Sequence, residues 1–252
     1  MISERERALE SVTEEAERVT GAADAAGVTL RVTGGVGVAL TCHSAGHDLL
    51  ARPYSDIDVV GHAREREPII ALLSGLGYAP DEMFNAMHGA RRLFFWDDAN
   101  NRQFDVFLDK VEMCHVIDLR ERLRGPGPAL TCADLLLMKL QIVESNEKDL
   151  RDIVCLLSDQ EFTEGGDDGI DISYLAELAA NDWGLWRTVT MVARRADAWA
   201  AQLPRLTSRE RVHRQACRFV EALEDVPKSR AWKLRARIGE RKRWYTLPEE
   251  AH

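Results

Sequence analysis

Two short stretches about twenty residues apart carry residue types that could do chemistry. Val32-Thr33-Gly34-Gly35 is typical of a strand that ends in a glycine pair, and Ser55-Asp56-Ile57-Asp58-Val59-Val60 is an apolar strand with two carboxylates. Side chains alternate along a strand, so we expect Asp56 and Asp58 on the same face. Two anions held this close repel each other unless a cation lies between them. Beside a phosphate-sized glycine turn, the pair predicts Mg²⁺ with a nucleoside triphosphate.

A third carboxylate, Asp105, lies in the middle of another apolar run, Gln103-Phe104-Asp105-Val106-Phe107-Leu108. Three acids on neighbouring strands can hold two cations about 3.5–4 Å apart, a spacing that clamps an in-line displacement at phosphorus. The competing interpretation places Asp105 at a sheet edge, facing solvent.

The first half of the chain predicts the sheet that would position these acids. We expect strands at Val28–Thr33, Asp56–Val60, Arg91–Trp96, Gln103–Leu108 and His115–Leu119, and helices at Val36–Thr41 and Glu65–Ser74. Asp97-Asp98-Ala99-Asn100-Asn101 is rich in turn-forming residues, so it predicts a hairpin between the strands that flank it.

The second half of the chain predicts helices. Gly125-Pro126-Gly127-Pro128 is the clearest linker, because proline and glycine break both helices and strand ladders. Beyond it we expect helices near 131–144, 147–158, 171–181, 183–202, 208–224 and 228–242. The predicted fold class is therefore α+β: a small mixed sheet with flanking helices in a domain over residues 1–126, followed by an all-helical domain over residues 129–252.

The charge of the chain is unevenly distributed. The formal net charge of the 252 residues is −9, but the segment 205–243 carries 13 Lys and Arg against 5 Asp and Glu. A globally acidic protein is not a general nucleic-acid binder, whereas its basic end could contact an anionic partner. The competing interpretation is a solvated helix face.

Several classes of protein are not expected from this composition. No stretch approaches 18 apolar residues, so we expect no membrane span. The first residues are charged and lack an apolar segment, which does not fit a signal peptide. The five cysteines are scattered without metal-ligand spacing, which favours reduced thiols and a cytoplasmic location. The histidines expected at the surface, rather than as ligands, are His43, His47, His88 and His115.

These motifs together resemble the nucleotidyltransferase superfamily typified by DNA polymerase beta. The resemblance lies in Thr33-Gly34-Gly35, in Arg52-x-x-Ser55-Asp56-Ile57-Asp58 and in a later strand aspartate. The runs 133–140 and 146–153 are similar to the branch of abortive-infection (type IV toxin–antitoxin) toxins and lincosamide-type antibiotic nucleotidyltransferases. The resemblance covers roughly residues 25–160. Its first motif is often Gly-Ser, and this chain has Gly-Gly instead.

The resemblance implies a role for each matching residue. The implied catalytic residues are Asp56, Asp58, Asp105 and Lys139, with the three aspartates as ligands of two Mg²⁺ ions. The implied nucleotide-binding residues are Gly34, Gly35, Arg52, Ser55, Lys148 and Asp149. The glycines would let the backbone approach the triphosphate, and Lys139 would neutralise its charge. Asp105 would also accept the proton of an attacking hydroxyl.

The helical part of the motif has a simpler interpretation, an exposed face with short-range ion pairs. In one continuous helix Lys148 would lie about 180° from Lys139. The two lysines can therefore act together only if the helix breaks near Ser145-Asn146.

We expect an Mg²⁺-dependent nucleotidyltransferase that uses a nucleoside triphosphate such as ATP and a hydroxyl acceptor, either a small molecule or an RNA. One alternative is a toxin that modifies tRNA and has an antitoxin protein as partner. Further alternatives are a non-catalytic nucleotide-binding module and a metal-dependent phosphatase.

Overall fold

A computed structural model describes residues 8–47, 49–125, 127–166 and 168–247 of the chain. The chain folds into two compact units, each described here by itself. The first consists of Met1–Thr41, Pro53–Val111 and Ile117–Leu130, and the second of Cys42–Arg52, Glu112–Val116 and Thr131–His252. The units are discontinuous in sequence, whereas the predicted domains 1–126 and 129–252 are continuous and stay a prediction.

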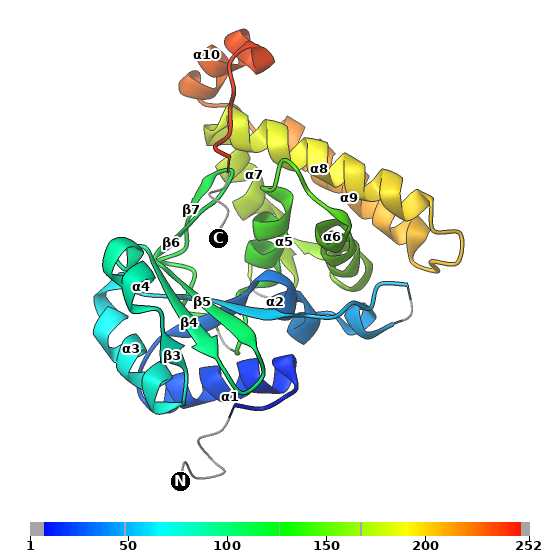
Figure 1. Cartoon of the computed structure of the whole chain (residues 1–252). Coiled ribbons are helices and arrows are strands. Elements are labelled where there is room, and N and C mark those ends of the chain that lie inside the picture. Colours follow the sequence, from blue (N-terminus) through cyan, green and yellow to red (C-terminus); the bar gives the residue numbers. More distant parts are fainter. Residues whose placement is uncertain (1–7, 48, 126, 167, 248–252) are drawn as a thin grey trace. The chain divides into compact units, whose positions relative to one another are not determined.

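A five-stranded mixed sheet forms the centre of the first unit (Figure 1). Its strands are β1 (Leu30–Thr33), β2 (Asp56–Gly61), β3 (Ala79–Pro80), β4 (Arg92–Asp97) and β5 (Arg102–Leu108), in the order β1-β2-β5-β4-β3. β2 and β5 are parallel, and the other neighbouring strands are antiparallel. The expected hairpin is confirmed by β4 and β5. Because β5 is an interior strand, the edge position considered for Asp105 is wrong.

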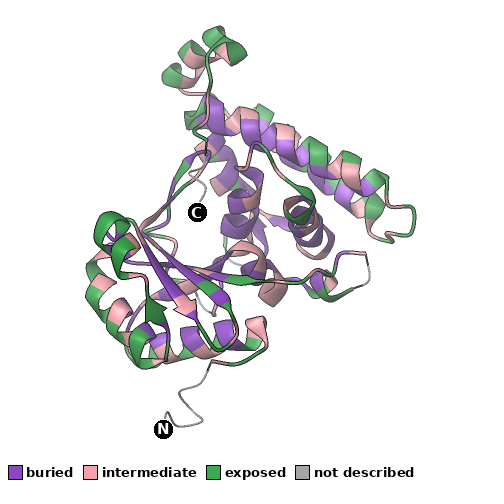
Figure 2. Ribbon diagram, in the orientation of Figure 1, coloured by how far each residue is buried: buried purple, intermediate pink, exposed green. Residues whose placement is uncertain are grey.

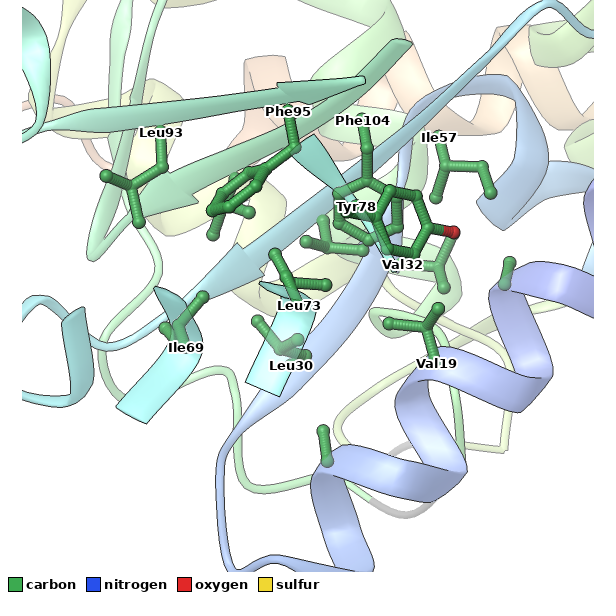
Figure 3. Packing of buried hydrophobic residues seen from close by; sticks show 14 of the residues in the cluster. Val19, Leu30, Val32, Ile57, Ile69, Leu73, Tyr78, Leu93, Phe95 and Phe104 are labelled. Carbon is green, nitrogen blue, oxygen red and sulfur yellow. The ribbon is translucent and has the colours of Figure 1, made fainter. Parts of the chain in front are cut away.

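One face of this sheet carries the hydrophobic core. The helices of the unit are α1 (Val12–Ala25), α2 (Gly34–Thr41), the short 3₁₀ helix η3 (Ala63–Glu65), α3 (Arg66–Gly75) and α4 (Glu82–His88). Val19 of α1 and Leu73 of α3 pack with Ile57, Phe95 and Phe104 of the sheet (Figure 3). Since side chains alternate along each strand, the neighbours of these core residues point to the opposite face.

The helix after β1 begins earlier than expected. α2 begins at Gly34 rather than at Val36, so the glycine pair forms its first turn instead of a separate loop. The short elements β3 and α4 were not expected. Asp81 caps α4 by accepting from the Phe84 backbone N–H at 2.8 Å, and so short a helix gives too few turns for a clear apolar period.

The second unit is mainly helical. Its α-helices are α5 (Cys132–Leu140), α6 (Glu147–Asp159), α7 (Ile172–Asn181), α8 (Trp183–Ala201), α9 (Arg209–Asp225) and α10 (Arg230–Ile238). It also contains the 3₁₀ helices η2 (His43–Gly46) and η4 (Gly239–Arg241) and the two-stranded pair β8 (Phe162–Thr163) and β9 (Ile170–Asp171). Side-chain caps from Thr131, Asn146 and Asp182 help to fix where α5, α6 and α8 begin.

Burial differs strongly among these helices. α8 has a buried face along its whole length, whereas α10 has no buried residue and exposes Leu234 and Ile238 (Figure 2). His115 is 8% exposed and contacts Thr188 Oγ1 through Nε2 at 2.8 Å, so its expected surface position is wrong. His43, His47 and His88 are exposed, as expected.

The expected strand at 115–119 is present in part. β6 (Lys110–Glu112) and β7 (Val116–Asp118) form a two-stranded sheet where the chain passes from the first unit to the second and back. The predicted α+β class, with a small mixed sheet, flanking helices and a following helical region, is confirmed. Among the described residues, no helix has the length and apolar character needed to cross a membrane.

Candidate active site

The register of the sheet places two of the predicted aspartates side by side. Asp58 on β2 is the direct partner of Asp105 on β5, and Thr33 on β1 is the direct partner of Asp58. Register partners point to the same face of a sheet, with neighbouring strands about 4.8 Å apart. Asp56 lies two residues before Asp58 and shares that face. The first unit therefore brings all three carboxylates to the face opposite its core.

Gly34 lies directly against Asp58. Its φ is +64°, and a Cβ at this position would lie 2.4 Å from Asp58 Oδ2. Both the backbone conformation and the close approach therefore require glycine. Gly35 follows as the second residue of α2. The unpaired backbone N–H groups of the first turn of α2 thus begin beside a carboxylate.

Thr33 adds a polar atom to the same row. The side chain is 4% exposed, and its Oγ1 is buried with no hydrogen-bond partner in the part of the chain that the structure describes. A buried hydroxyl normally has a hydrogen-bond partner, because leaving that hydrogen bond unmade costs about 1–3 kcal/mol. This face therefore has an unused hydroxyl next to Asp58.

Asp105 is buried and already has one cationic partner. It is 4% exposed, and Arg92 Nε donates to its Oδ1 at 2.6 Å. The Arg92 guanidinium lies over the rings of Phe107 and Phe84, at 5.1 and 5.7 Å. Burial raises the pKa of Asp105, the Arg92 hydrogen bond and charge oppose the rise, and the Asp56 charge adds to it. The ionised form of Asp105 therefore depends on a neighbouring cation.

Asp56 is the most exposed of the three aspartates. Ser55 Oγ donates to Asp56 Oδ1 at 3.2 Å, which ties the serine to the first acid of the row. An open cavity of about 660 Å³ lies beside Ser55, with Tyr54 and Arg102 in its wall, and none of the three carboxylates lines it. Ser55 therefore lies between this cavity and the aspartate face.

The donors on this face fit Mg²⁺ by their chemistry, since three carboxylates and a hydroxyl are the hard oxygen ligands that this ion prefers. The Arg92 guanidinium shows that a cation can sit on Asp105. As the side chains stand, no group of three or more His, Cys, Asp or Glu within the described ranges is gathered tightly enough to hold a metal ion. Binding would therefore require the carboxylates to close around the ion.

The second unit brings together three other predicted residues, Arg52, Lys139 and Asp149. Arg52 donates to Asp152 through Nε at 3.0 Å and through Nη2 at 2.7 Å. Lys139 Nζ lies 2.8 Å from Asp152 Oδ2 and 3.2 Å from Asp149 Oδ1. Asp152 is 1% exposed. Two cations and two anions are thus linked in one network, which we call the Lys139 network.

The charge of Lys139 is kept by this network. Burial lowers its pKa, but the charges and hydrogen bonds of Asp152 and Asp149 outweigh burial, and the pKa is raised overall. The interpretation of this motif as an exposed face is wrong for Lys139 and Asp152. The central role of Asp152 was missed, because its bidentate partner lies 100 residues away in sequence.

The predicted break between the two lysines is confirmed. α5 ends at Leu140, and α6 begins at Glu147 with Asn146 as its cap. Lys148 lies in the first turn of α6, is exposed, and its ammonium forms no ion pair with the residues that the structure describes. The Lys139 network therefore includes Asp149 but not Lys148.

Comparison with known proteins gives little beyond this geometry. No family model matches the chain, and no curated protein matches it. A solution structure of the antibiotic-resistance factor ANT(2'')-Ia, described as having substrate-regulated conformation dynamics, is similar with a TM-score of 0.34 and 12% identity. The match covers 88% of this chain and 91% of that one. Because this TM-score is low, it assigns neither a fold family nor an activity to this chain.

Proposed function

We propose that this chain is an Mg²⁺-dependent nucleotidyltransferase that moves a nucleoside monophosphate from a nucleoside triphosphate to a hydroxyl acceptor and releases pyrophosphate. The observation that supports this best is the register pairing of Asp58 with Asp105, with Asp56 on the same face. Like charges are brought together at this face, and the first turn of α2 begins beside them. Carboxylates next to backbone N–H donors are suited to a triphosphate with its metal ions.

Each residue of the aspartate face has a part in the proposed reaction. Asp56, Asp58 and Asp105 would hold two Mg²⁺ ions, which when bound neutralise phosphate charge and align the displacement. Asp105 would accept the proton of the attacking hydroxyl, and its raised pKa makes it a stronger base than an ordinary aspartate. Gly34 and Gly35 would present backbone N–H groups to the phosphates, and Ser55 would orient Asp56.

The second unit supplies a further set of predicted phosphate-binding groups. Lys139 and Arg52 are cationic but hold Asp149 and Asp152 in the structure. As phosphate-binding groups, they would contact phosphate oxygens of a triphosphate while they remain paired with these two acids. Lys148 is exposed and is free of ion pairs with the described residues, so it would add a further charge.

The acceptor is proposed as a small molecule or a tRNA. α10 and the residues after it favour tRNA, because the cations Lys233, Arg237 and Lys242 are exposed there and could contact phosphates. A binding site built on these cations would lose affinity for tRNA steeply between about 50 and 200 mM salt. No binding to tRNA at low salt would favour the small-molecule acceptor. An antitoxin partner stays a prediction.

The test is transfer of label from each of four α-labelled nucleoside triphosphates, with Mg²⁺, to pooled amino sugars or to total tRNA. We expect labelled acceptor and pyrophosphate from the unchanged chain, and a loss of about 100-fold or more in Asp56→Asn and Asp58→Asn. Glu17→Gln, an exposed change on α1, is the matched control and should retain full activity. Equal labelling by the unchanged chain and Asp58→Asn would overturn the proposal.

Other outcomes identify the alternatives. Nucleotide binding that needs Mg²⁺, without pyrophosphate release for any acceptor, would indicate a binding module. Release of inorganic phosphate instead of pyrophosphate would indicate a phosphatase.

A further inference from the structure

A cysteine, a histidine and an aspartate meet on the surface of the second unit, and the proposed function uses none of them. His213 and Cys217 lie one turn apart on α9, and Asp197 lies on α8. His213 Nδ1 lies 2.9 Å from Asp197 Oδ2, and its Nε2 lies 3.8 Å from Cys217 Sγ. These two contacts thus link a nucleophile, Cys217, to a base, His213, and the base to a group that orients it, Asp197. We call these three residues the Cys217 triad.

The hydrogen bond to Asp197 fixes how His213 carries its proton. An ionised carboxylate can only accept a hydrogen bond, so a neutral imidazole must place its proton on Nδ1. Nε2 then has a free lone pair directed to the thiol of Cys217. The proton of the thiol can pass to this nitrogen, and Asp197 stabilises the imidazolium that results.

Cys217 is also the accessible cysteine of the chain. All five cysteines fall within the described residues, and Cys217 is the exposed one. Burial raises the pKa of the Cys114 and Cys132 thiols, and it raises the pKa of Cys155 to about 12. Cys42 is buried. A reagent in solution therefore meets one thiol that is both exposed and next to a base.

Other charges near the triad are mainly basic. At positions adjacent to the three residues or one turn away from them, the chain carries four arginines and two glutamates: Arg194 on α8, and Arg209, Glu210, Arg214, Arg218 and Glu221 on α9. From the side of α6, Glu161 is already paired with Arg211 of α9 at 2.8 Å. Among the described residues, the base in hydrogen-bond contact with the Cys217 thiol is His213.

We infer that Cys217 is a modification site that undergoes thiol–disulfide exchange with small, low-molecular-weight disulfides. The Cys217 thiol gives its proton to His213 Nε2, and the thiolate attacks one sulfur of the disulfide. The sulfur–sulfur bond of the reagent breaks as the bond to Cys217 Sγ forms. The leaving thiolate takes the proton from His213, so one thiol and one disulfide are consumed and one of each is formed.

The test uses the full chain and bis(2-hydroxyethyl) disulfide, a neutral reagent that does not titrate, with intact mass as the readout. At pH 6, an ordinary thiol of pKa about 8.5 is less than about 1% ionised. His213 Nε2 can accept the thiol proton as Cys217 Sγ attacks, so we expect the unchanged chain to react about tenfold faster than His213→Asn. Near pH 9.5 the two rates should converge, because hydroxide can then remove the thiol proton without a neighbouring base.

Two further variants complete the experiment. Cys217→Ser should gain no mass from the reagent, which would place the reaction on this residue. Asp197→Asn should react at an intermediate rate at pH 6. Melting curves of the variants should match that of the unchanged chain, because the triad lies at the surface, where His213 is 64% exposed. Equal rates for the unchanged chain and His213→Asn at pH 6, or the same gain in mass in Cys217→Ser, would overturn the inference.

Discussion

Arg92 Nε, on strand β4, donates a hydrogen bond to Asp105 Oδ1, on strand β5, across 2.6 Å. The acid is buried, and burial raises its pKa. The ionised state of this aspartate therefore depends on a cation that lies outside the three-aspartate motif. The first two predictions follow from this dependence.

Replacing Arg92 by glutamine should destabilise the protein in a pH-dependent way. At pH 7, Asp105 loses its cation, so we expect the free energy of unfolding to fall by about 3 kcal/mol. A carboxyl with a raised pKa contributes stability below the unfolded value of about 3.9 and loses it as the pH rises through the folded value. The loss should therefore be smaller at pH 4.5 than at pH 7, as measured by urea unfolding.

Arg64→Gln is the control for that prediction. Arg64 has 76% side-chain exposure, and its ion pair with Glu65 lies at the surface. We expect a change of less than about 0.5 kcal/mol at either pH. An equal loss at both pH values in Arg92→Gln would contradict a role for Arg92 in keeping Asp105 ionised.

As the pH falls, binding of Mg²⁺ should weaken at a higher pH than it would if Asp105 had the pKa of an ordinary aspartate. A protonated carboxyl does not ligate the ion, and the pKa of Asp105 is raised above its usual value by burial. We expect the Mg²⁺-induced rise in melting temperature to shrink between pH 7 and pH 5. Asp105→Asn should show a smaller rise that does not change over this range, and an unchanged pH dependence in that variant would exclude Asp105 as the titrating group.

Alanine substitutions at three glycines of the first unit distinguish the cost of backbone strain from the cost of crowding at the site. Gly34→Ala meets both a φ of +64° and Asp58 Oδ2 at 2.4 Å, so it should destabilise the fold by more than about 2 kcal/mol and displace Asp58. Gly27→Ala has a φ of +69° but open space around its Cβ, so we expect a loss of about 1–2 kcal/mol.

Gly21→Ala completes this series. Gly21 lies inside α1 with nothing near its Cβ, so alanine should stabilise the protein by about 0.5–1 kcal/mol. Thermal unfolding measures all three variants. Equal costs for Gly34→Ala and Gly27→Ala would show that the contact with Asp58 is unimportant.

The Lys139 network should be essential for stability. Asp152→Ala leaves Arg52 and Lys139 without the acceptor they share, and breaking a buried ion pair in this way costs about 3–5 kcal/mol. Glu147→Gln is the matched control on the same helix, because it removes an exposed pair with Arg151 worth less than about 0.5 kcal/mol. Similar urea midpoints for the two variants would contradict the network's structural role.

The sequence predicted the elements whose signal is local. The long helices α6 to α9 begin and end within about two residues of the expected positions, because each repeats its apolar period over several turns and most have a side-chain cap. The placement of Asp56, Asp58 and Asp105 on one face followed from strand alternation and from the pairing of their strands.

The remaining features depend on partners far away in sequence. Arg92 contacts Asp105 only once the hairpin folds, and Arg52 reaches Asp152 only after α6 is in place. His115 was expected at the surface, since its own neighbours give no sign of Thr188, its partner 73 residues later. Periodicity shows which face of an element is buried, but it does not show which ion pairs the buried face will form.

The discontinuous make-up of the second unit bears on how the protein can be dissected. A single cut at the Gly-Pro stretch would leave the helical fragment without Arg52, and with it the bidentate partner of Asp152. Such a fragment would be expected to express poorly or aggregate. Separate production of the helical part would instead need fused copies of segments 42–52 and 112–116, or co-expression of both pieces.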